Sequence, residues 1–592
     1  MPDALLDSRS EFDRAKVLVS RWLRENVGHC RVLSADDLAA TGSERRFVAG
    51  WNLEIDSPSG PQHFDVLIDN RFPYSPIRVA CTTGDFYLQR PHVEPGGVLC
   101  LPRRPVPSTG VQSAIAVALS DAVALTQDWL DPTVMEAEFQ REFVSYWNRV
   151  TDKGAVPIRS LLDAANRQAR RTFVWFSEKY TLVGESRDQL LDWLKNRGRV
   201  EESKLVTGAF IHLDRPPVPP FPSRIGELFA LLQSHGRNAT ALVAQLSVKE
   251  DLAIVAQAHS QSGDGLIGMI VSKPKNFDGF RKSDKLGAHS RLALWRLKSE
   301  LRKTTVERFD AGWVHGRGFN RDLPKLQSAT VVILGCGSLG SQVAHRLAQS
   351  GVGGIVLVDP ERLSSANVGR HALGIDSVDI NKAAALARTL RRHFPHMRRI
   401  EDHAISWQSL HDVDPTIFER ASLIVSCLGE WSADGQLGEW QCRQETAPPI
   451  VYGWLDEFGT ASHAIVLSGP TGPALSCVLD QNGTLRVPET LWDNEGLMQA
   501  EPACGTLFQP FGPIEAGQAE ILVSRLCVDV LTGKTKPPCH RVYAGSTSQL
   551  IDAGGRWSEG HLRYRPTAFD GPFEYERSLD ACGQCRSCQK TL

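Results

Sequence analysis

Two cysteines stand in surroundings that suit nucleophilic chemistry. Cys100 follows the proline-rich and glycine-rich stretch 91–99, and Cys504 lies in the turn-prone segment 502–508. Because prolines and a Gly-Gly turn disfavour a packed strand, we expect Cys100 in an exposed loop. A thiolate is strongly nucleophilic near neutral pH and can accept an acyl group as a thioester. The two positions therefore predict acyl transfer through sulfur, with a buried structural cysteine as the alternative at each.

A nucleotide-binding unit is predicted between residues 330 and 382. A buried strand at 330–334 runs into a glycine-rich turn, a helix follows, and a second strand at 354–358 ends at Asp359. Backbone N–H groups of such a turn and the positive end of the helix dipole hold phosphate, and the acid suits a ribose hydroxyl. The turn glycines are Gly335, Gly337 and Gly340. These features alone are most often found in NAD-dependent oxidoreductases.

Polar side chains beyond Asp359 favour a triphosphate. Asn367, Arg370 and Lys382 offer more hydrogen bonds and positive charge than a dinucleotide needs, unless the two cations are solvated surface charges. The pattern resembles the ThiF/MoeB and ubiquitin-activating superfamily. This resemblance implies that Asp359 holds the ribose of ATP and that the three polar residues hold its phosphates. It also implies that Cys504 captures the acyl group from an acyl adenylate.

Two further parts of the implied ATP site stay open between alternatives. The superfamily holds Mg²⁺ with an acid after the fourth strand, but Gly429 stands at that place. Glu430 or Asp434 could take over the metal. The superfamily also has an arginine upstream of the glycine turn, near the triphosphate. Arg317 and Arg321 both qualify by their spacing.

The segment before Cys100 resembles a ubiquitin-conjugating domain. Residues 47–56 and 64–69 alternate apolar and polar like strands of a meander with one buried face, and a proline-rich break follows. Counting back from Cys100, the family's H-P-N tripeptide falls on residues 90–92. The resemblance implies that Cys100 carries a thioester and that His92 replaces the Asn that steadies the oxyanion during aminolysis. An imidazole N–H can fill that role, although a surface histidine beside a turn is the alternative.

The two resemblances together are similar to the bacterial fusions of conjugating and activating domains in CBASS anti-phage operons. They imply an enzyme that uses ATP and Mg²⁺ to adenylate the C-terminal carboxylate of a protein. The acyl group would pass from Cys504 to Cys100 and then to an amine. The implied donor is a cGAS-like nucleotidyltransferase, and the implied assembly is a homodimer. Conjugation of a bacterial ubiquitin-like protein and a sulfur-carrier adenylyltransferase of the ThiF/MoeB type are the alternatives.

The chain is predicted to be an α/β and α+β multidomain protein with three parts. We expect an N-terminal ubiquitin-conjugating-like α+β domain at 1–155, an α+β linker or scaffold domain at 156–304, and a C-terminal ThiF-like Rossmann-type adenylation domain at 305–592. Helical periodicity in 112–129 and in 134–150 completes the first domain. The linker domain contains a proline-rich connector at 214–222, and its role stays open.

Composition indicates an ordinary globular enzyme. The chain has 592 residues, of which 42% are hydrophobic and 23% charged. Its net charge of −2 argues against a nucleic-acid-binding surface. No run of 18 apolar residues occurs and the first residues do not resemble a signal peptide, so we expect a cytoplasmic protein without membrane contact.

A cysteine cluster near the C-terminus is a candidate zinc site. In the cytoplasm the 13 cysteines stay reduced, so metal binding or catalysis accounts for them better than disulfides. Three thiolates spaced as overlapping C-x-x-C pairs could fill three corners of a tetrahedral Zn²⁺ site, with redox-active or merely disordered cysteines as the alternative. They are Cys582, Cys585 and Cys588. The fourth ligand stays open between Cys539, His540 and another thiol.

Overall fold

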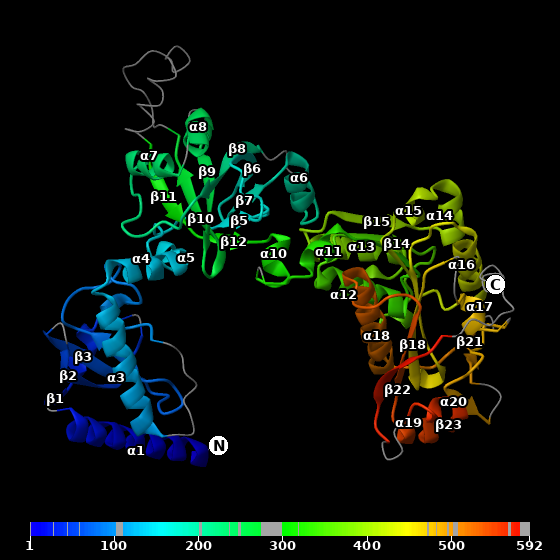
Figure 1. Ribbon diagram of the computed structural model, residues 1–592, viewed down its shortest axis with the longest axis horizontal. Coiled ribbons are helices and arrows are strands. Elements are labelled where there is room, and N and C mark those ends of the chain that lie inside the picture. Colours follow the sequence, from blue (N-terminus) through cyan, green and yellow to red (C-terminus); the bar gives the residue numbers. More distant parts are fainter. Residues whose placement is uncertain are drawn as a thin grey trace, which may run out of the picture. The chain divides into compact units, whose positions relative to one another are not determined.

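The computed structural model divides the chain into two compact units (Figure 1). One unit comprises Met1–Arg159, Asn166–Val183 and Val206–Glu307, and the other comprises Ser160–Ala165, Gly184–Leu205 and Arg308–Leu592. The structure describes residues 2–27, 29–43, 45–57, 60–101, 110–199, 204–235, 237–246, 250–273, 299–317, 319–469, 473–480, 482–493, 497–500, 507–565 and 570–579. The domain boundaries expected near residues 155 and 304 remain predictions.

The N-terminal part of the first unit is a four-stranded antiparallel meander. Its strands are β1 (His29–Val32), β2 (Ala49–Ser57), β3 (Gly60–Ile68) and β4 (Arg78–Cys81), in that order across the sheet. Its helices are α1 (Pro2–Asn26), α2 (Ala35–Ala40) and α3 (Val111–Asp128). Alternate residues of β2, such as Trp51 and Leu53, are buried in one core with apolar side chains of α1 and α3. β2 and β3 thus overlap the strands expected at 47–56 and 64–69, although β3 already begins at Gly60 and its second half is buried without alternation.

The helix expected at the end of the conjugating domain is interrupted at Glu142. α4 (Pro132–Arg141) begins with Asp131, whose carboxylate accepts hydrogen bonds from the backbone N–H groups of the first turn. α5 (Phe143–Arg149) follows after Glu142, whose φ of −113° and ψ of 24° are not helical. Phe143 and Trp147 of α5 are buried in the core of the next sheet. This burial explains why α5 leaves the direction of α4.

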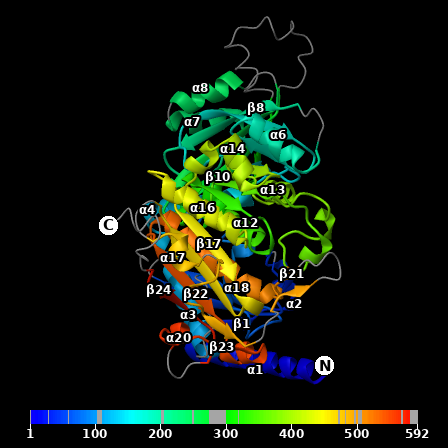
Figure 2. The same ribbon diagram turned by 90° about the vertical axis from the view of Figure 1, so that its right-hand side faces the viewer.

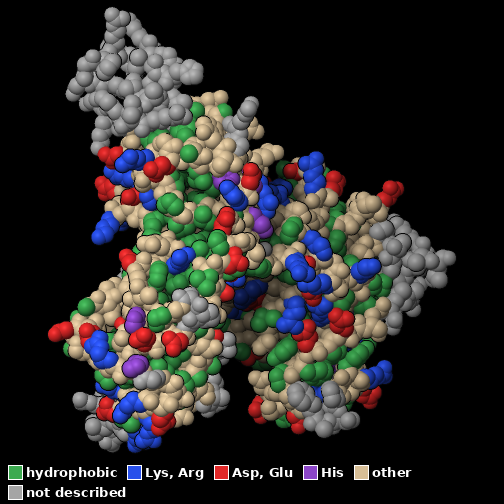
Figure 3. Space-filling view, turned by 60° about the vertical axis from the view of Figure 1, so that its left-hand side comes forward, with side chains coloured by type: hydrophobic (Ala, Val, Ile, Leu, Met, Phe, Trp, Pro, Cys, Tyr) green, Lys and Arg blue, Asp and Glu red, His purple; other side chains and the backbone are tan. Residues whose placement is uncertain are grey.

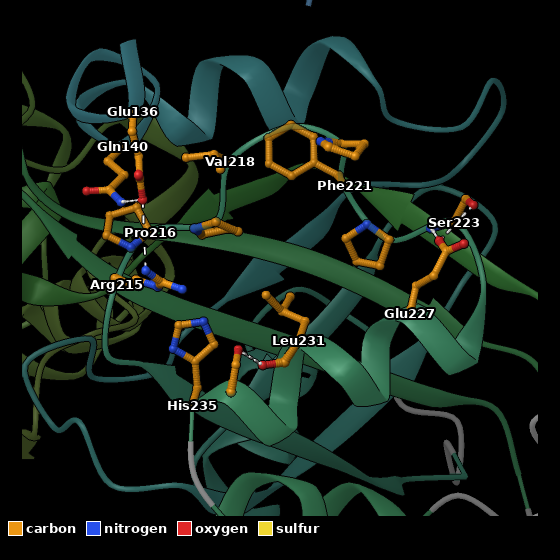
Figure 4. A pocket seen from close by; sticks show the side chains of 14 residues that line it. Glu136, Gln140, Arg215, Pro216, Val218, Phe221, Ser223, Glu227, Leu231 and His235 are labelled. Atoms are coloured by element: carbon orange, nitrogen blue, oxygen red, sulfur yellow. Dashed lines mark hydrogen bonds and ion pairs between the residues drawn. The ribbon is translucent and has the colours of Figure 1, made fainter. Parts of the chain in front are cut away.

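The second sheet has eight strands and two covering helices. Its order is β11 (Leu301–Thr304), β10 (Gly263–Val271), β9 (Leu252–Ser260), β8 (Val206–Leu213), β6 (Arg170–Phe176), β7 (Thr181–Gly184), β5 (Ile158–Ser160) and β12 (Val306–Arg308). α7 (Ile225–Ser234) and α8 (Arg237–Leu246) bury apolar residues against β8, β9 and β10. Residues 214–222 connect β8 to α7 and line a cavity of ≈ 440 Å³, shown in Figure 4. The α+β character expected of this region is confirmed.

The second unit contains a Rossmann-type sheet, of which Figure 2 labels strands β17, β22 and β24. Its order is β15 (Arg399–His403), β14 (Gly354–Val358), β13 (Thr330–Leu334), β16 (Leu423–Ser426), β17 (Ile450–Leu455), β18 (Ala461–Leu467), β22 (Cys539–Ala544) and β24 (Phe573–Arg577). The first five strands pair in parallel and the last three pair antiparallel. Parallel strands covered on both faces read as continuous apolar runs, which is why 330–334 and 354–358 were recognisable.

Helices cover both faces of this sheet. Val331 and Ile333 of β13 enter a core with α12 (Ser338–Ser350), α13 (Lys382–His393) and α18 (Pro513–Thr532). Val332 and Leu334 enter the opposite core with α14 (Trp407–Val413), α15 (Thr416–Glu419), α16 (Trp431–Arg443) and α17 (Leu475–Val478). The parallel sheet and its helices confirm the expected α/β class.

Shorter elements complete the second unit. They are α6 (Arg187–Lys195), α10 (Ala311–Val314), α11 (Leu323–Ser328), β19 (Thr490–Trp492), β20 (Gln499–Ala500), β21 (Leu507–Phe508), α19 (Thr547–Asp552), β23 (Gly555–Trp557) and α20 (Glu559–Leu562). Basic and acidic side chains are interspersed on the face shown in Figure 3. Within the described residues, none of the helices has the length and apolar character needed to cross a membrane.

Candidate active sites

The glycine turn between β13 and α12 is crowded at two of its three glycines. A Cβ on Gly335, whose φ is +82°, would lie 2.7 Å from the carbonyl oxygen of Cys427, and one on Gly340 would lie 1.8 Å from the carbonyl oxygen of Gly335. A Cβ on Gly337 would meet nothing within 4 Å. Gly335 and Gly340 therefore serve the shape of the turn. Gly337 leaves open space at the start of α12, where backbone N–H groups can receive a phosphate.

Asp359 joins the end of β14 to this turn. One carboxylate oxygen accepts a hydrogen bond from the backbone N–H of Cys336 at 2.7 Å, and the other accepts one from Glu361 at 2.8 Å. Burial raises the pKa of Asp359, because desolvation of the carboxylate outweighs these hydrogen bonds. Each carboxylate oxygen can accept more than one hydrogen bond, so a ribose hydroxyl can still be bound there.

The three residues expected to hold phosphates differ in their surroundings. Lys382, buried at the start of α13, pairs its ammonium with the carboxylate of Glu361. The guanidinium carbon of Arg370 lies 5.1 Å from the centre of the Phe511 ring. The Asn367 side chain accepts hydrogen bonds from Ser364 and stabilises its own turn. The structure thus brings Lys382 close to Asp359, while Asn367 serves the local chain path.

His371 is a buried part of this site that the sequence interpretation missed. Its Nε2 lies 2.7 Å from the carbonyl oxygen of Cys336, and its Nδ1 accepts a hydrogen bond from the backbone N–H of Leu373. These contacts require a neutral ring with the proton on Nε2, and burial lowers the pKa of His371 accordingly. Its position directly after Arg370 was the available signal. His371 fixes the segment after Arg370 against the glycine turn.

Two carboxylates lie at the end of β16, where a metal was expected. Asp434, in the first turn of α16, accepts a hydrogen bond from Ser426, and burial raises its pKa to about 6. The negative charge of the exposed Glu430 raises that pKa further. Mg²⁺ is commonly held by one or two carboxylates together with substrate phosphates, so the donor set fits this ion. No cluster of three or more potential metal ligands occurs within the described part of the chain.

Structural information is limited for several of the predicted residues. Cys504 and the zinc candidates Cys582, Cys585 and Cys588 lie outside the described residues. Of the proposed fourth zinc ligands, Cys539 is buried in β22, and His540 lies with its Nε2 3.0 Å from Nδ1 of His463. Arg317 and Arg321 are both exposed, so both stay candidates.

Cys100 is exposed on a tight loop, as the prolines and glycines before it predicted. Its backbone N–H donates a hydrogen bond of 2.8 Å to the carbonyl oxygen of His92, so the loop folds back on itself. Gly96 and Gly97 have φ values of +78° and +75°, and added Cβ atoms would lie 2.1 Å and 2.4 Å from backbone oxygens. The Gly-Gly turn is therefore required for the loop that places His92 beside Cys100.

His92 lies in a hydrogen-bonded setting with a side chain only 12% exposed. Its Nε2 lies 2.9 Å from a carboxylate oxygen of Glu138, and its Nδ1 lies 3.6 Å from one of Glu142. Burial alone would lower the pKa of His92, but hydrogen bonds to the side chains of Cys100 and Glu138 and the nearby negative charges raise it overall. The backbone N–H of His92 also donates to the hydroxyl of Tyr146 at 2.8 Å. From the sequence, Glu138, Glu142 and Tyr146 were expected on a helix, and no function was predicted for them.

A cavity of ≈ 490 Å³ extends from Cys100 along α3 and α4. Apolar side chains such as Leu125 and Met135 line it together with four acidic residues and the cation Arg141. The acidic residues are Asp121, Asp128, Glu138 and Glu142. A thiol, an imidazole and carboxylates side by side can carry out acyl transfer with proton transfer.

The chain is similar to known proteins in both of these regions. Residues 317–537 match the ThiF family, and residues 32–156 match the Prokaryotic E2 family B. The ATP-dependent ubiquitin transferase-like protein Cap2 of Pseudomonas aeruginosa is 27% identical over 227 residues, which cover 37% of this chain and 39% of that protein. The protein of the same name from Enterobacter hormaechei is 33% identical over 105 residues, 18% of this chain and 17% of that protein.

The matched regions thus span less than half of these curated relatives. Among solved structures, Escherichia coli MccB with ATP has a TM-score of 0.32 and 16% identity, covering 45% of this chain and 69% of that one. The two family matches agree with the expected order of domains. The chain therefore joins a conjugating-like region that matches the prokaryotic E2 family B to an activating-like region that matches the ThiF family.

Proposed function

We propose that this protein is an ATP-dependent, ubiquitin-transferase-like enzyme that activates the C-terminal carboxylate of a protein and ligates it to an amine. The observation that carries this proposal is the presence of two sites on one chain. A glycine turn suited to phosphate, with Asp359 and Lys382 beside it, lies in the ThiF-family region, and the exposed Cys100 lies in the E2-family region. The printed name of the Cap2 relatives, ATP-dependent ubiquitin transferase-like protein, supports it.

The reaction proceeds through three acyl donors. The carboxylate attacks the α-phosphate of ATP, which gives an acyl adenylate and releases pyrophosphate. The thiolate of Cys504 displaces AMP, and the thiolate of Cys100 displaces Cys504 by thioester exchange. An amine then displaces Cys100 and forms an amide. Each thioester is a better acyl donor than the amide, so the amide is the final product.

The proposed roles follow the positions described above. Asp359 binds the ribose, and Arg370 and Lys382 bind phosphates. Asn367, whose side-chain oxygen accepts from Ser364, offers its amide N–H groups to a phosphate. A phosphate would replace Glu361 as the partner of Lys382, which is buried beside the turn. Asp434 or Glu430 would hold Mg²⁺, which would neutralise phosphate charge. Cys582, Cys585 and Cys588 would hold a structural Zn²⁺.

The proposed donor is a cGAS-like nucleotidyltransferase in CBASS anti-phage defence, and the proposed assembly is a cytoplasmic homodimer. These proposals rest on the resemblance of the domain order to such fusions. A bacterial ubiquitin-like protein is the alternative donor. Mass spectrometry of the protein retained on Cys100 during turnover would identify the donor directly.

Trapping the thioesters tests the pathway. With donor, ATP and Mg²⁺, the parent protein should form two adducts that reducing agent releases. Cys504→Ala should abolish both, and Cys100→Ala should spare the adduct on Cys504. If the protein forms the acyl adenylate but Cys100 is dispensable for its reaction, the protein is instead a sulfur-carrier-type adenylyltransferase. If neither cysteine is ever acylated by any candidate donor, the proposal is wrong.

The nucleotide site has a separate test. Lys382→Ala removes a cation from the phosphates, so ATP–pyrophosphate exchange should slow by about a hundredfold, the effect expected for a charged phosphate contact. The matched control is Lys325→Ala. Lys325 donates a hydrogen bond to the carbonyl oxygen of Thr532, away from the glycine turn, and its loss should leave exchange unchanged. Equal exchange rates for Lys382→Ala and the parent would refute the assigned role.

A further inference from the structure

Three side chains form a continuous arrangement at the conjugating cysteine. Cys100 and His92 line the same cavity, and the imidazole of His92 contacts Glu138 of α4 through Nε2 at 2.9 Å. A carboxylate can only accept, so Nε2 carries a proton that it donates to Glu138. Nδ1 is then the nitrogen left to accept a proton. This is the arrangement of a nucleophile, a base and an orienting carboxylate.

We propose that His92 is the base that accepts a proton in the reactions at Cys100. Glu138 is the positioning residue that orients its imidazole for this task. This inference rests on the proposed function and changes the expectation that His92, like an Asn at the same place, steadies the oxyanion. An oxyanion donor needs an N–H group directed at the thioester carbonyl. Here the N–H of Nε2 is already donated to Glu138.

The backbone of His92 is fixed independently of its ring. Its N–H donates to Tyr146 of α5 at 2.8 Å, and its carbonyl oxygen accepts from Cys100 at 2.8 Å. Its φ of +61° lies in the left-handed region, which few residues other than glycine occupy without support. The backbone of His92 is therefore held from both sides before any substrate arrives.

Acidic side chains near His92 favour a protonated imidazole. Glu138 and Arg141 come from α4, and the ion pair between them leaves Glu138 able to accept from His92 as well. Glu142, between α4 and α5, lies 3.6 Å from Nδ1, and Tyr146 of α5 contacts the backbone. Asp121 and Asp128 of α3 line the same cavity. Together these acids stabilise an imidazolium and attract an acceptor that arrives as an ammonium ion.

The proposed step balances as follows. The acceptor arrives as an ammonium ion, and Nδ1 of His92 takes one of its protons. The neutral amine then attacks the thioester carbonyl on Cys100, so that the new carbon–nitrogen bond forms, the carbon–sulfur bond breaks, and the Cys100 sulfur leaves with the electron pair. The second proton lost by the amine nitrogen goes to that sulfur, and the imidazolium releases its proton to water. The acceptor class is therefore a primary amine that must lose a proton, such as a lysine side chain.

Three substitutions separate this role from oxyanion stabilisation. Glu138→Gln keeps the size of the side chain but removes the charge that orients the imidazole. His92→Asn introduces the family's donor, which is not a base. The matched control is Glu136→Gln, on the same helix. Glu136 lies near Gln140 and Arg215 at the other cavity, as Figure 4 shows.

The measurement is discharge of the Cys100 thioester by free lysine and by hydroxylamine at pH 7. His92→Asn should slow lysine discharge by about a hundredfold, the lower end of the range for a positioned base, and Glu138→Gln, which only removes the orienting charge, should slow it by roughly tenfold. Hydroxylamine is already neutral at this pH, so its discharge should change little. Glu136→Gln should match the parent with both nucleophiles. The acid limb of the lysine pH profile should move to lower pH in Glu138→Gln, because the carboxylate that raises the pKa of His92 is gone.

Three outcomes would contradict these roles of His92 and Glu138. If His92→Asn discharges to lysine as fast as the parent, His92 is an oxyanion donor and the inference is wrong. If Glu138→Gln and Glu136→Gln behave alike, Glu138 does not position the ring. Equal slowing with lysine and hydroxylamine would indicate a merely structural role.

A second measurement needs neither ATP nor donor. Iodoacetamide should alkylate Cys100 of the full-length protein several-fold more slowly at pH 7 in His92→Asn and Glu138→Gln than in the parent or Glu136→Gln. If the parent never forms a thioester, the proposed function fails and this alkylation series alone decides the role of His92. Equal alkylation rates in all four proteins would overturn it.

Discussion

Gly340→Ala is the most direct test of the glycine turn. The added methyl carbon would lie 1.8 Å from the carbonyl oxygen of Gly335, whereas real Cβ contacts essentially never fall below 3.0 Å. The obstacle is backbone, and Gly335 in turn lies against the carbonyl of Cys427, so neither can retreat easily. Overpacking of this kind costs about 3 kcal/mol. The thermal midpoint of the nucleotide-binding domain should fall by roughly 6–12 °C.

Gly337→Ala is the matched control in the same turn. A Cβ there meets nothing within 4 Å, and the φ of −76° and ψ of −152° lie at the edge of the extended region open to alanine, so the midpoint should fall far less than in Gly340→Ala. The methyl group would nevertheless enter the space reserved for phosphate, so ATP should protect this variant less against heat than it protects the parent. Differential scanning calorimetry with and without ATP measures both effects. A parental midpoint for Gly340→Ala, or equal losses in the two variants, would refute the reasoning.

Two buried carboxylates give further predictions. Glu489, fully buried, contacts His561 at 2.9 Å and pairs with Arg577, so Glu489→Gln should lower the free energy of unfolding by about 3–5 kcal/mol in denaturant titrations. The raised pKa of Asp434 means that its folded carboxyl binds protons more tightly than the unfolded one, so stability declines as pH rises from about 4 to about 6. Asp434→Asn should therefore be up to about 3 kcal/mol more stable than the parent at pH 7.5 and equal to it near pH 4; a constant difference across pH would contradict this.

The nucleotide-binding unit could be predicted from the sequence because each of its features depends on neighbouring residues. Buried parallel strands give uninterrupted apolar runs, a tight turn demands glycine, and an acid at the end of β14 follows within the same short segment. The exposure of Cys100 was predictable for the same reason, since prolines and the Gly-Gly turn act on adjacent residues. Each of these signals lies within a few residues of the feature that it predicts.

The contacts that were missed join distant segments. Glu138 meets His92 across 46 residues of sequence, and this contact depends on where α4 ends. The end of α4 at Glu142 depends on the burial of Phe143 in a different sheet, which helical periodicity does not reveal. Asp434 beside Ser426 is likewise a product of the turn from β16 into α16.

The left-handed backbone at His92 has a consequence for the history of this site. Asparagine and histidine are among the few side-chain-bearing residues that tolerate such a conformation, and their codons differ by a single base. Tyr146 and the backbone N–H of Cys100 form hydrogen bonds only with main-chain atoms of residue 92. Both hydrogen bonds are therefore compatible with either asparagine or histidine at this position. Residue 92 can therefore change between asparagine and histidine without a change in the backbone conformation of the loop. Its role would change at the same time between oxyanion donor and base.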